Sequence, residues 1–197
     1  MPRIGLERKN QRRQQIVDAA WRCAARMGFR DLTVDDVCAE ARLSKGTFYG
    51  YFEQKRDLLL ALFEDDARRL DELMDDLERQ IPNRRDRLRV YTQSVLARSS
   101  DTAQVQVRAD MWSAMLTEKE VHGAFGASMQ ERRVRLRKWI EEAINAGELV
   151  DIPANAFASI LLALSDGLLL HGSLDPNAFR WINISKALDV LLNGISS

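Results

Sequence analysis

Apolar residues recur at three- and four-residue steps along almost the whole chain, and this spacing limits what the chain can fold into. No stretch alternates between apolar and polar residues over the length of a strand. No Asn-Gly or Asp-Gly pair joins two apolar runs as a hairpin would require. Only 10 glycines and 4 prolines interrupt the helical pattern. The sequence therefore predicts an all-α fold.

Local signals divide this pattern into helices. Gly28 lies where a left-handed C-terminal cap belongs, the segment from Thr33 to Asp36 resembles a capping box with Asp in place of Glu, and Ser44 can cap a third helix. Gly123 and Gly126 leave the boundary before the seventh helix open. The predicted helices are 11–27, 33–41, 45–52, 55–81, 84–99, 103–117, 120–146, 154–172 and 178–194.

Composition excludes several classes of protein. The only cysteines, Cys23 and Cys38, cannot build a disulfide scaffold, and both are expected to be buried on helix faces. The longest apolar stretch, 160–170, is too short to span a membrane, and no secretory signal is found. No nucleophile elbow, phosphate loop, dinucleotide fingerprint or metal-ligand spacing occurs. We expect a soluble cytoplasmic protein without enzymatic activity, metal or cofactor.

Charge is distributed unevenly although the net charge is zero. Residues 1–54 carry 10 basic and 7 acidic side chains, and residues 1–13 alone have a net charge of +4. A DNA-binding head would need such a positive end, and an ordinary basic tail would produce the same pattern. On the long fourth helix, Asp65 and Asp66 are expected to form a solvated acidic face.

Residues 11–52 have the layout of a helix-turn-helix: a long helix, a glycine turn, a short helix, a short turn and another short helix. The last of these is too polar for a core helix. Phe48 and Phe52, one turn apart, can anchor one face of it. The remaining side chains carry hydroxyl or amine groups suited to phosphate oxygens and base edges, namely Lys45, Thr47, Tyr49 and Tyr51.

Residues 12–59 resemble the TetR family of bacterial transcriptional regulators, most specifically through the run from Leu43 to Tyr49 followed by Tyr51, Phe52 and Lys55. The resemblance implies a third helix in the major groove and DNA contacts from Thr33, Lys45, Gly46, Thr47, Tyr49, Gly50, Tyr51 and Lys55. Two residues depart from the family pattern. Gly50 replaces a larger side chain, and Ala24 replaces a large aromatic, so that the first helix is expected to pack through Trp21 instead.

The resemblance further implies an N-terminal three-helix head, residues 1–54, joined by a long helix to a C-terminal bundle, residues 55–197, that binds an effector and dimerises. Its last two helices would form the homodimer through Leu161, Leu164, Leu168, Leu188, Leu191 and Leu192. A small-molecule site is expected among Arg108, Met111, Trp112, Met115, His122, Phe125, Met129 and Asp166. For each apolar member of this second set, ordinary core packing is the alternative.

The function predicted is that of a ligand-responsive regulator, a repressor that binds a palindromic operator in double-stranded DNA as a homodimer and is released by an effector. The alternative is a helical interaction or ligand-carrying protein that binds no operator.

Overall fold

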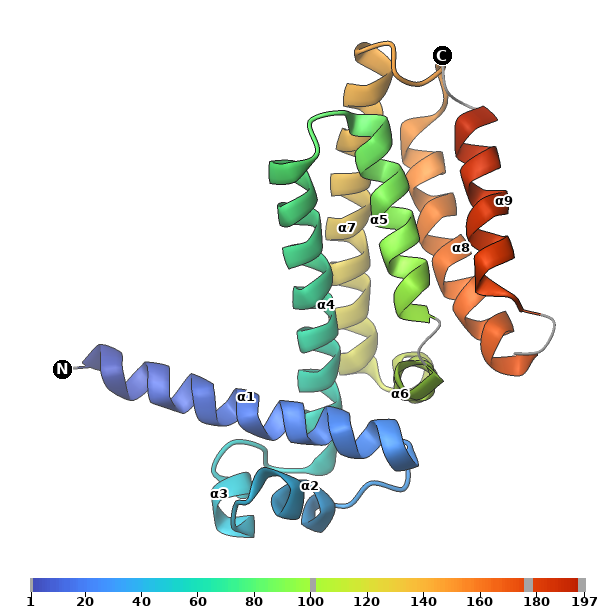
Figure 1. Ribbon diagram of the computed structural model, residues 1–197. Helices are drawn as coiled ribbons and strands as arrows, with labels where there is room; N and C mark the ends of the chain where they lie inside the picture. The colour runs from blue at the N-terminus through green and yellow to red at the C-terminus, as the bar shows by residue number, and fades with distance from the viewer. Residues whose placement is uncertain (1, 100–101, 176–178, 195–197) are drawn as a thin grey trace. The chain divides into compact units, whose positions relative to one another are not determined.

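The computed structural model describes residues 2–99, 102–175 and 179–194, and within these ranges every regular element is an α-helix (Figure 1). The all-α prediction is therefore confirmed for the described residues. Their helices are α1 (Pro2–Met27), α2 (Val34–Ala41), α3 (Lys45–Tyr49), α4 (Lys55–Gln80), α5 (Arg84–Ser99), α6 (Thr102–Thr117), α7 (Lys119–Asn145), α8 (Ala154–Leu174) and α9 (Trp181–Gly194).

The chain divides into two compact units. The first comprises residues 1–68 and 106–122, and the second comprises residues 69–105 and 123–197. This division differs from the expected boundary after residue 54, because the first turns of α4 are buried in the first unit. Leu58 and Leu62 of α4 have no exposed surface. Most of α6 also belongs to the first unit, which the sequence pattern did not indicate.

The predicted caps at Gly28, Thr33 and Ser44 are confirmed. Thr33 Oγ1 accepts a hydrogen bond from the Asp36 backbone N–H at 3.2 Å, and the Asp36 carboxylate accepts one from the Thr33 N–H at 2.8 Å. Ser44 Oγ accepts from the backbone N–H of Thr47 at 3.2 Å. Gly28 has a φ of 80°, which favours glycine directly after α1. α2 and α3 thus begin where a side chain satisfies the backbone, and α1 ends at a glycine with positive φ.

Three helices depart clearly from the predicted boundaries. α3 ends at Tyr49, before Gly50, and not at Phe52. α1 begins at Pro2, well before Gln11, because polar residues extend it where no apolar periodicity marks a helix. α7 continues through Gly123 and Gly126, at which an added Cβ would meet no atom within 4 Å. A solvent-facing glycine weakens a helix by only about 1 kcal/mol, so these two residues do not end it.

A buried carboxylate joins α1 to α4. Asp65 is 4% exposed, although a solvated acidic face was expected. It accepts hydrogen bonds from the Trp21 indole N–H at 3.0 Å and the Gln14 amide at 2.9 Å, and it pairs with Arg68 at 2.5 Å. The neighbouring Asp66 is paired with Arg108 at 3.1 Å. The expectation for both residues was wrong, because donors distant in sequence cover them.

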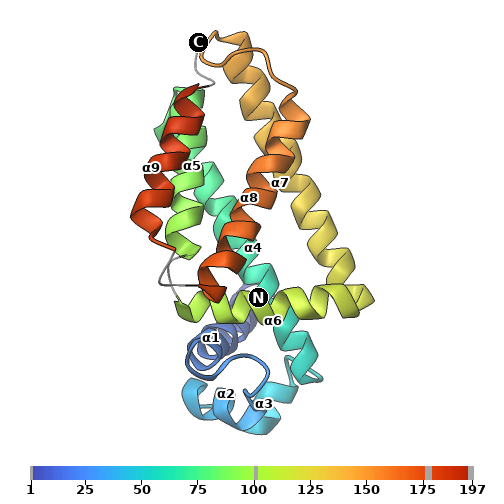
Figure 2. The same cartoon turned by 90° about the vertical axis from the view of Figure 1, so that its right-hand side faces the viewer.

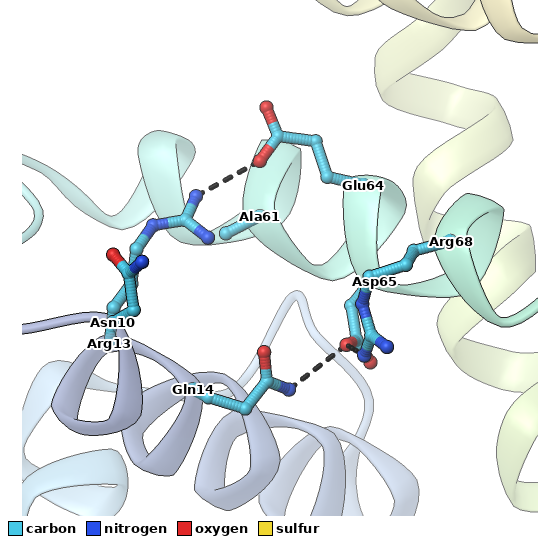
Figure 3. Close-up of a pocket in the computed structure, with 7 residues that line it drawn as sticks. All are labelled: Asn10, Arg13, Gln14, Ala61, Glu64, Asp65 and Arg68. Carbon is cyan, nitrogen blue, oxygen red and sulfur yellow. Dashed lines mark hydrogen bonds and ion pairs between the residues drawn. The ribbon is translucent and has the colours of Figure 1, made fainter. Parts of the chain in front are cut away.

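Figure 3 shows the polar groove beside this junction, of about 270 Å³. Arg13 and Gln14 of α1 point across it toward Glu64 and Asp65 of α4. The Arg13 guanidinium lies 2.9 Å from Glu64. The groove is therefore spanned by bonds between the two helices.

The second unit is built around Trp139 of α7, which is 1% exposed. Its indole N–H donates to Glu78 at 2.7 Å, and the ring of Tyr91 meets its ring edge-on at 6.0 Å. Arg135, bonded to the same carboxylate, lowers the pKa of Glu78. α5, α8 and α9 lie side by side in this unit (Figures 1 and 2).

One stretch in the described residues, Ala154–Gly172 of α8, is long and apolar enough to cross a membrane by length and composition, with a mean hydropathy of 1.4. Core helices of soluble proteins pass the same test. Leu161 and Leu162 of this stretch are buried in the core that contains Trp139. The stretch therefore already has protein packed against part of its surface.

Replacing Asp65 should destabilise the first unit. Asp65→Ala removes the acceptor of the partly buried Trp21 indole and of Gln14, which keeps only its bond to Asp18, and it leaves Arg68 without its carboxylate partner. We expect a loss of about 2–4 kcal/mol in the free energy of unfolding. Glu64→Ala, on the same helix, removes an ion pair whose glutamate side chain is 60% exposed, and should cost less than about 1 kcal/mol. Urea unfolding followed by circular dichroism measures both. Equal losses would contradict the role given to Asp65.

Candidate nucleic-acid interface

α3 has one buried face and one exposed face. Phe48 is 1% exposed and Phe52 is 3% exposed, and their ring centroids lie 5.6 Å apart. This pair anchors the helix, as predicted. Anchoring it this way leaves Lys45, Gly46 and Tyr49 exposed on the other side, with Thr47 partly exposed. At Gly46 an added Cβ would meet only Ser44 Oγ, at 3.9 Å, so this face presents nearly bare backbone.

Lys45 already has an acidic partner in the free protein. Its ammonium lies 2.8 Å from Asp35 of α2, and both side chains are largely exposed. The hydrogen bond to Asp35 raises the pKa of Lys45, which keeps the ammonium charged. An exposed pair of this kind contributes little to stability, so the lysine can exchange Asp35 for another acceptor.

Two of the predicted hydroxyl groups take part in helix caps. The Thr33 hydroxyl donates to the Asp36 carboxylate at 2.5 Å, and this bond lowers the pKa of Asp36. The Thr47 hydroxyl lies 3.0 Å from Ser44 Oγ. Both threonines are thus held in position by their neighbours in the turn.

Lys55 is placed differently from the other predicted contacts. Its ammonium donates to the carbonyl of Arg30 at 2.8 Å and lies 4.9 Å from the centroid of the Phe29 ring. Burial lowers its pKa. Lys55 thus fastens the loop after α1 to the start of α4, and its ammonium retains N–H donors for a further acceptor.

Tyr51 and Gly50 follow α3. Tyr49 is 52% exposed, whereas Tyr51 is partly buried and lines a surface groove together with basic residues of α1. Gly50 has a φ of −72°, which any residue adopts, so its small size and not its conformation distinguishes it. The sequence pattern did not predict that the basic N-terminal residues would lie beside Tyr51.

The residues expected to bind an effector fall into both units. Arg108, Met111, Trp112, Met115 and His122 belong to the first unit, and Phe125, Met129 and Asp166 belong to the second. Met111 is buried and His122 is exposed. Arg108 forms the ion pair with Asp66 already described. The structure therefore does not bring the eight residues together in one unit.

The six leucines expected at a dimer interface also divide. Leu161, Leu188 and Leu192 are buried within their own protomer, at 3%, 5% and 8% exposure. Leu164 and Leu168 are partly buried and pack against the cluster that contains Leu188 and Leu192. Leu191 is 66% exposed. Only Leu191 thus presents most of its surface to the outside.

The two cysteines are buried free thiols, as expected. Burial raises the pKa of Cys23 and of Cys38, which keeps both thiols protonated. Among the described residues, no group of three or more His, Cys, Asp or Glu side chains could hold a metal ion.

Family models match both the N-terminal and the C-terminal part of the chain. Residues 16–62 match the family described as bacterial regulatory proteins, tetR family, and residues 84–193 match the C-terminal domain of BetI-type transcriptional repressors. The chain belongs to the TetR family. This TetR-family chain therefore carries the DNA-binding helix-turn-helix of transcriptional regulators, and the match includes α2 and α3.

Relatives and solved structures support the assignment. The regulator BetI of Burkholderia ambifaria is 30% identical over 88% of this chain and 87% of its own. The repressor AcnR of Corynebacterium diphtheriae is 34% identical, over only 38% of this chain and 39% of its own. A TetR regulator from Haloarcula marismortui has the same fold, with a TM-score of 0.85 at 18% identity, covering 95% of this chain and all of its own.

Two further structures of this fold contain ligands. A transcriptional regulator from Saccharomonospora viridis is in complex with choline, with a TM-score of 0.81 at 19% identity over 95% of this chain and 99% of its own. FadR from Bacillus subtilis is in complex with stearoyl-CoA, with a TM-score of 0.74 at 18% identity over 91% and 96% of the two chains.

Removing the partner of Lys45 should tighten DNA binding by the TetR-family chain. Asp35→Asn frees the ammonium and takes a negative charge away from the phosphates, so we expect affinity for duplex DNA to rise by about tenfold at low salt and by less at high salt. Asp151→Asn makes the same charge change at an exposed position in the second unit and serves as the control. Fluorescence anisotropy measures both. Equal affinities for the two variants would contradict a DNA-facing position for Asp35.

Proposed function

We propose that this TetR-family regulator is a cytoplasmic repressor that binds a palindromic operator as a homodimer and dissociates when a small molecule binds. The exposed polar face of α3 carries the proposal, because Lys45, Gly46 and Thr47 lie on a helix anchored from behind by Phe48. Lysine donates to guanine acceptors, and the methyl group of threonine fits against that of thymine. Lys45 and Thr47 are therefore the side chains proposed to read bases.

The remaining predicted contacts are proposed to bind the backbone of DNA. Tyr49 offers an exposed hydroxyl, Lys55 a cation fastened at the start of α4, and Thr33 a capped helix start. Such contacts set the register of the protein without reading the sequence.

An exposed apolar face supports dimerisation. α8 and α9 leave six large apolar side chains outside the protomer core, with exposures between 42% and 73%: Ile160, Leu170, Leu174, Ile182, Val190 and Leu191. Exposed apolar side chains of this number on two neighbouring helices favour a protein partner. A second copy of the chain fits the two-fold symmetry of a palindrome. We propose this outward face, with Leu164 and Leu168 at its base, as the dimer interface.

Contacts of α6 offer a route by which an effector could act. Asp110 accepts a hydrogen bond from the Phe29 backbone N–H at 2.7 Å, directly after α1. Arg108 pairs with Asp66 of α4, and Glu118 lies 3.5 Å from Arg56 at the start of α4. A ligand that displaces α6 would therefore pull on both α1 and α4. For this to release DNA, the ligand must bind the two arrangements with different affinity.

The chemical class of the effector is not specified by the fold. Choline is a small quaternary ammonium ion and stearoyl-CoA is a large acyl thioester, yet both occupy structures of this fold. Both compounds are therefore the first probes, added to the purified chain in separate experiments.

Selection of bound genomic fragments by the purified full chain tests the function. We expect an enriched palindrome, with lower recovery in the presence of an effector. The Lys45→Ala variant should relax the preference at particular half-site positions, at a cost of about 1–3 kcal/mol there. If the base preferences were unchanged at every position, Lys45 would instead be assigned to the contacts with the DNA backbone. Recovery of no enriched sequence would favour the alternative, a helical interaction or ligand-carrying protein.

A carboxylate placed on the outward face should separate the protomers. Leu191→Glu puts a charge into the proposed interface, and we expect a folded monomer with reduced operator affinity, since one protomer makes half of the contacts. Leu116→Glu on α6, where the leucine is 80% exposed, is the control and should leave the dimer intact. Sedimentation velocity distinguishes the two. A Leu191→Glu variant that stays dimeric at low micromolar concentration, together with a dimeric Val190→Glu, would refute this interface.

A further inference from the structure

The first turns of α1 extend beyond the core of the first unit. Every residue from 5 to 12 is exposed, including Leu6 at 62%, and the first fully buried residue of the helix is Ile16. The match to the tetR family also begins at residue 16. These turns therefore contribute no core packing, and the family match does not account for them.

The basic side chains on these turns have no acidic partner, in contrast to the nearby Arg13. Among the described residues, Arg8 and Lys9 form no ion pair, and the Arg12 guanidinium donates to the uncharged Gln15 amide oxygen at 2.8 Å. Arg13, one residue further, is held by Glu64 and lies 5.4 Å from the centroid of the Phe52 ring. Arg13 serves the fold, whereas Arg8, Lys9 and Arg12 carry charge that the fold does not use.

Arg8, Lys9 and Arg12 line a surface groove that extends from α1 to Tyr51, just after α3. Gly5, Arg8, Lys9, Gln11, Arg12 and Gln15 of α1 form it together with Tyr51, which follows α3. No carboxylate lines this groove. The groove on the α4 side of α1 is lined by Glu64 and Asp65 instead. In Figure 1 the N-terminal turns of α1 run out past α3.

We propose that the N-terminal turns of α1 form a second DNA-binding element, in which Arg8, Lys9 and Arg12 bind backbone phosphates flanking the base pairs read by α3. The inference rests on the proposed operator binding and adds to it. Guanidinium and ammonium groups without acidic partners match the phosphate backbone, and the Tyr51 hydroxyl supplies a further donor in the same groove. Because these contacts are electrostatic, they raise affinity for any flanking sequence.

The test compares two variants of the full chain that each lose two charges. Arg8→Gln/Lys9→Gln removes charge from the groove. Arg137→Gln/Lys138→Gln removes the same charge from exposed positions on α7 in the second unit and is the matched control. Glutamine has nearly the helix propensity of lysine and arginine, so both variants should remain helical by circular dichroism.

The probes are duplexes recovered by selection with the wild-type chain, in two lengths. The short duplex ends at the outermost selected base pair, and the long one carries about ten more base pairs of arbitrary sequence on each side, one helical turn. On the long duplex we expect the groove variant to bind about tenfold or more weakly than wild type at moderate salt. The slope of log K against log salt should become less negative by about 3.6, because each of the two protomers loses two phosphate contacts and each contact contributes ~0.9. On the short duplex it should match wild type, and the control variant should match wild type on both.

The outcomes separate the two proposals. A wild-type chain that binds no duplex overturns operator binding, and the inference with it. A wild-type chain that binds operator, with a groove variant of unchanged affinity and salt slope on the long duplex, overturns the inference alone. An equal loss of affinity in the control variant also overturns it, because net charge and not the groove would then be responsible.

Discussion

The first unit depends on one buried carboxylate at the crossing of α1 and α4. Asp65 collects an indole, an amide and a guanidinium from both helices, and charge-assisted hydrogen bonds of this kind are directional. They therefore fix the angle at which the helices meet. α2 and α3 follow α1 through short capped turns. The position of the exposed face of α3 therefore depends on this junction. Replacing Asp65 with an apolar residue would thus affect both stability and the presentation of Lys45.

Much of the fold could be predicted because its signals are local. The cap at Thr33 and Asp36, the cap at Ser44 and the left-handed Gly28 each involve residues within one turn of one another, and all three were predicted. The early start of α1 could not be predicted, because residues 2–10 have no apolar periodicity. Two units were predicted, but the packing of the first turns of α4 and of most of α6 with the first unit was not, because it depends on which helices share a core. The placement of most of α6 in the first unit rests on packing of this kind.

The candidate site shows the same limit. The packing of Phe48 with Phe52 could be predicted from their spacing of four residues, although α3 ends at Tyr49 and Phe52 follows it. Asp65 looked like a solvated residue because its partner Trp21 is 44 positions away. Leucine spacing on α8 and α9 showed that both helices are apolar on several faces, but not which face the protomer itself covers. Leu161 and Leu188 are buried whereas Leu191 is exposed, because α5 packs against one side of α8 and of α9. The sequence alone does not reveal this packing.

The ion pair between Asp35 and Lys45 has a consequence for how a regulator searches a genome. In the proposed interface, the Asp35 carboxylate stays close to the DNA wherever no base acceptor replaces it, and its repulsion from the phosphates weakens binding. Because a genome offers on the order of 10⁶ or more competing sites, occupancy of an operator depends on the ratio of specific to non-specific affinity. A surface carboxylate that weakens every unmatched encounter can therefore raise operator occupancy, although it lowers the affinity for DNA as a whole.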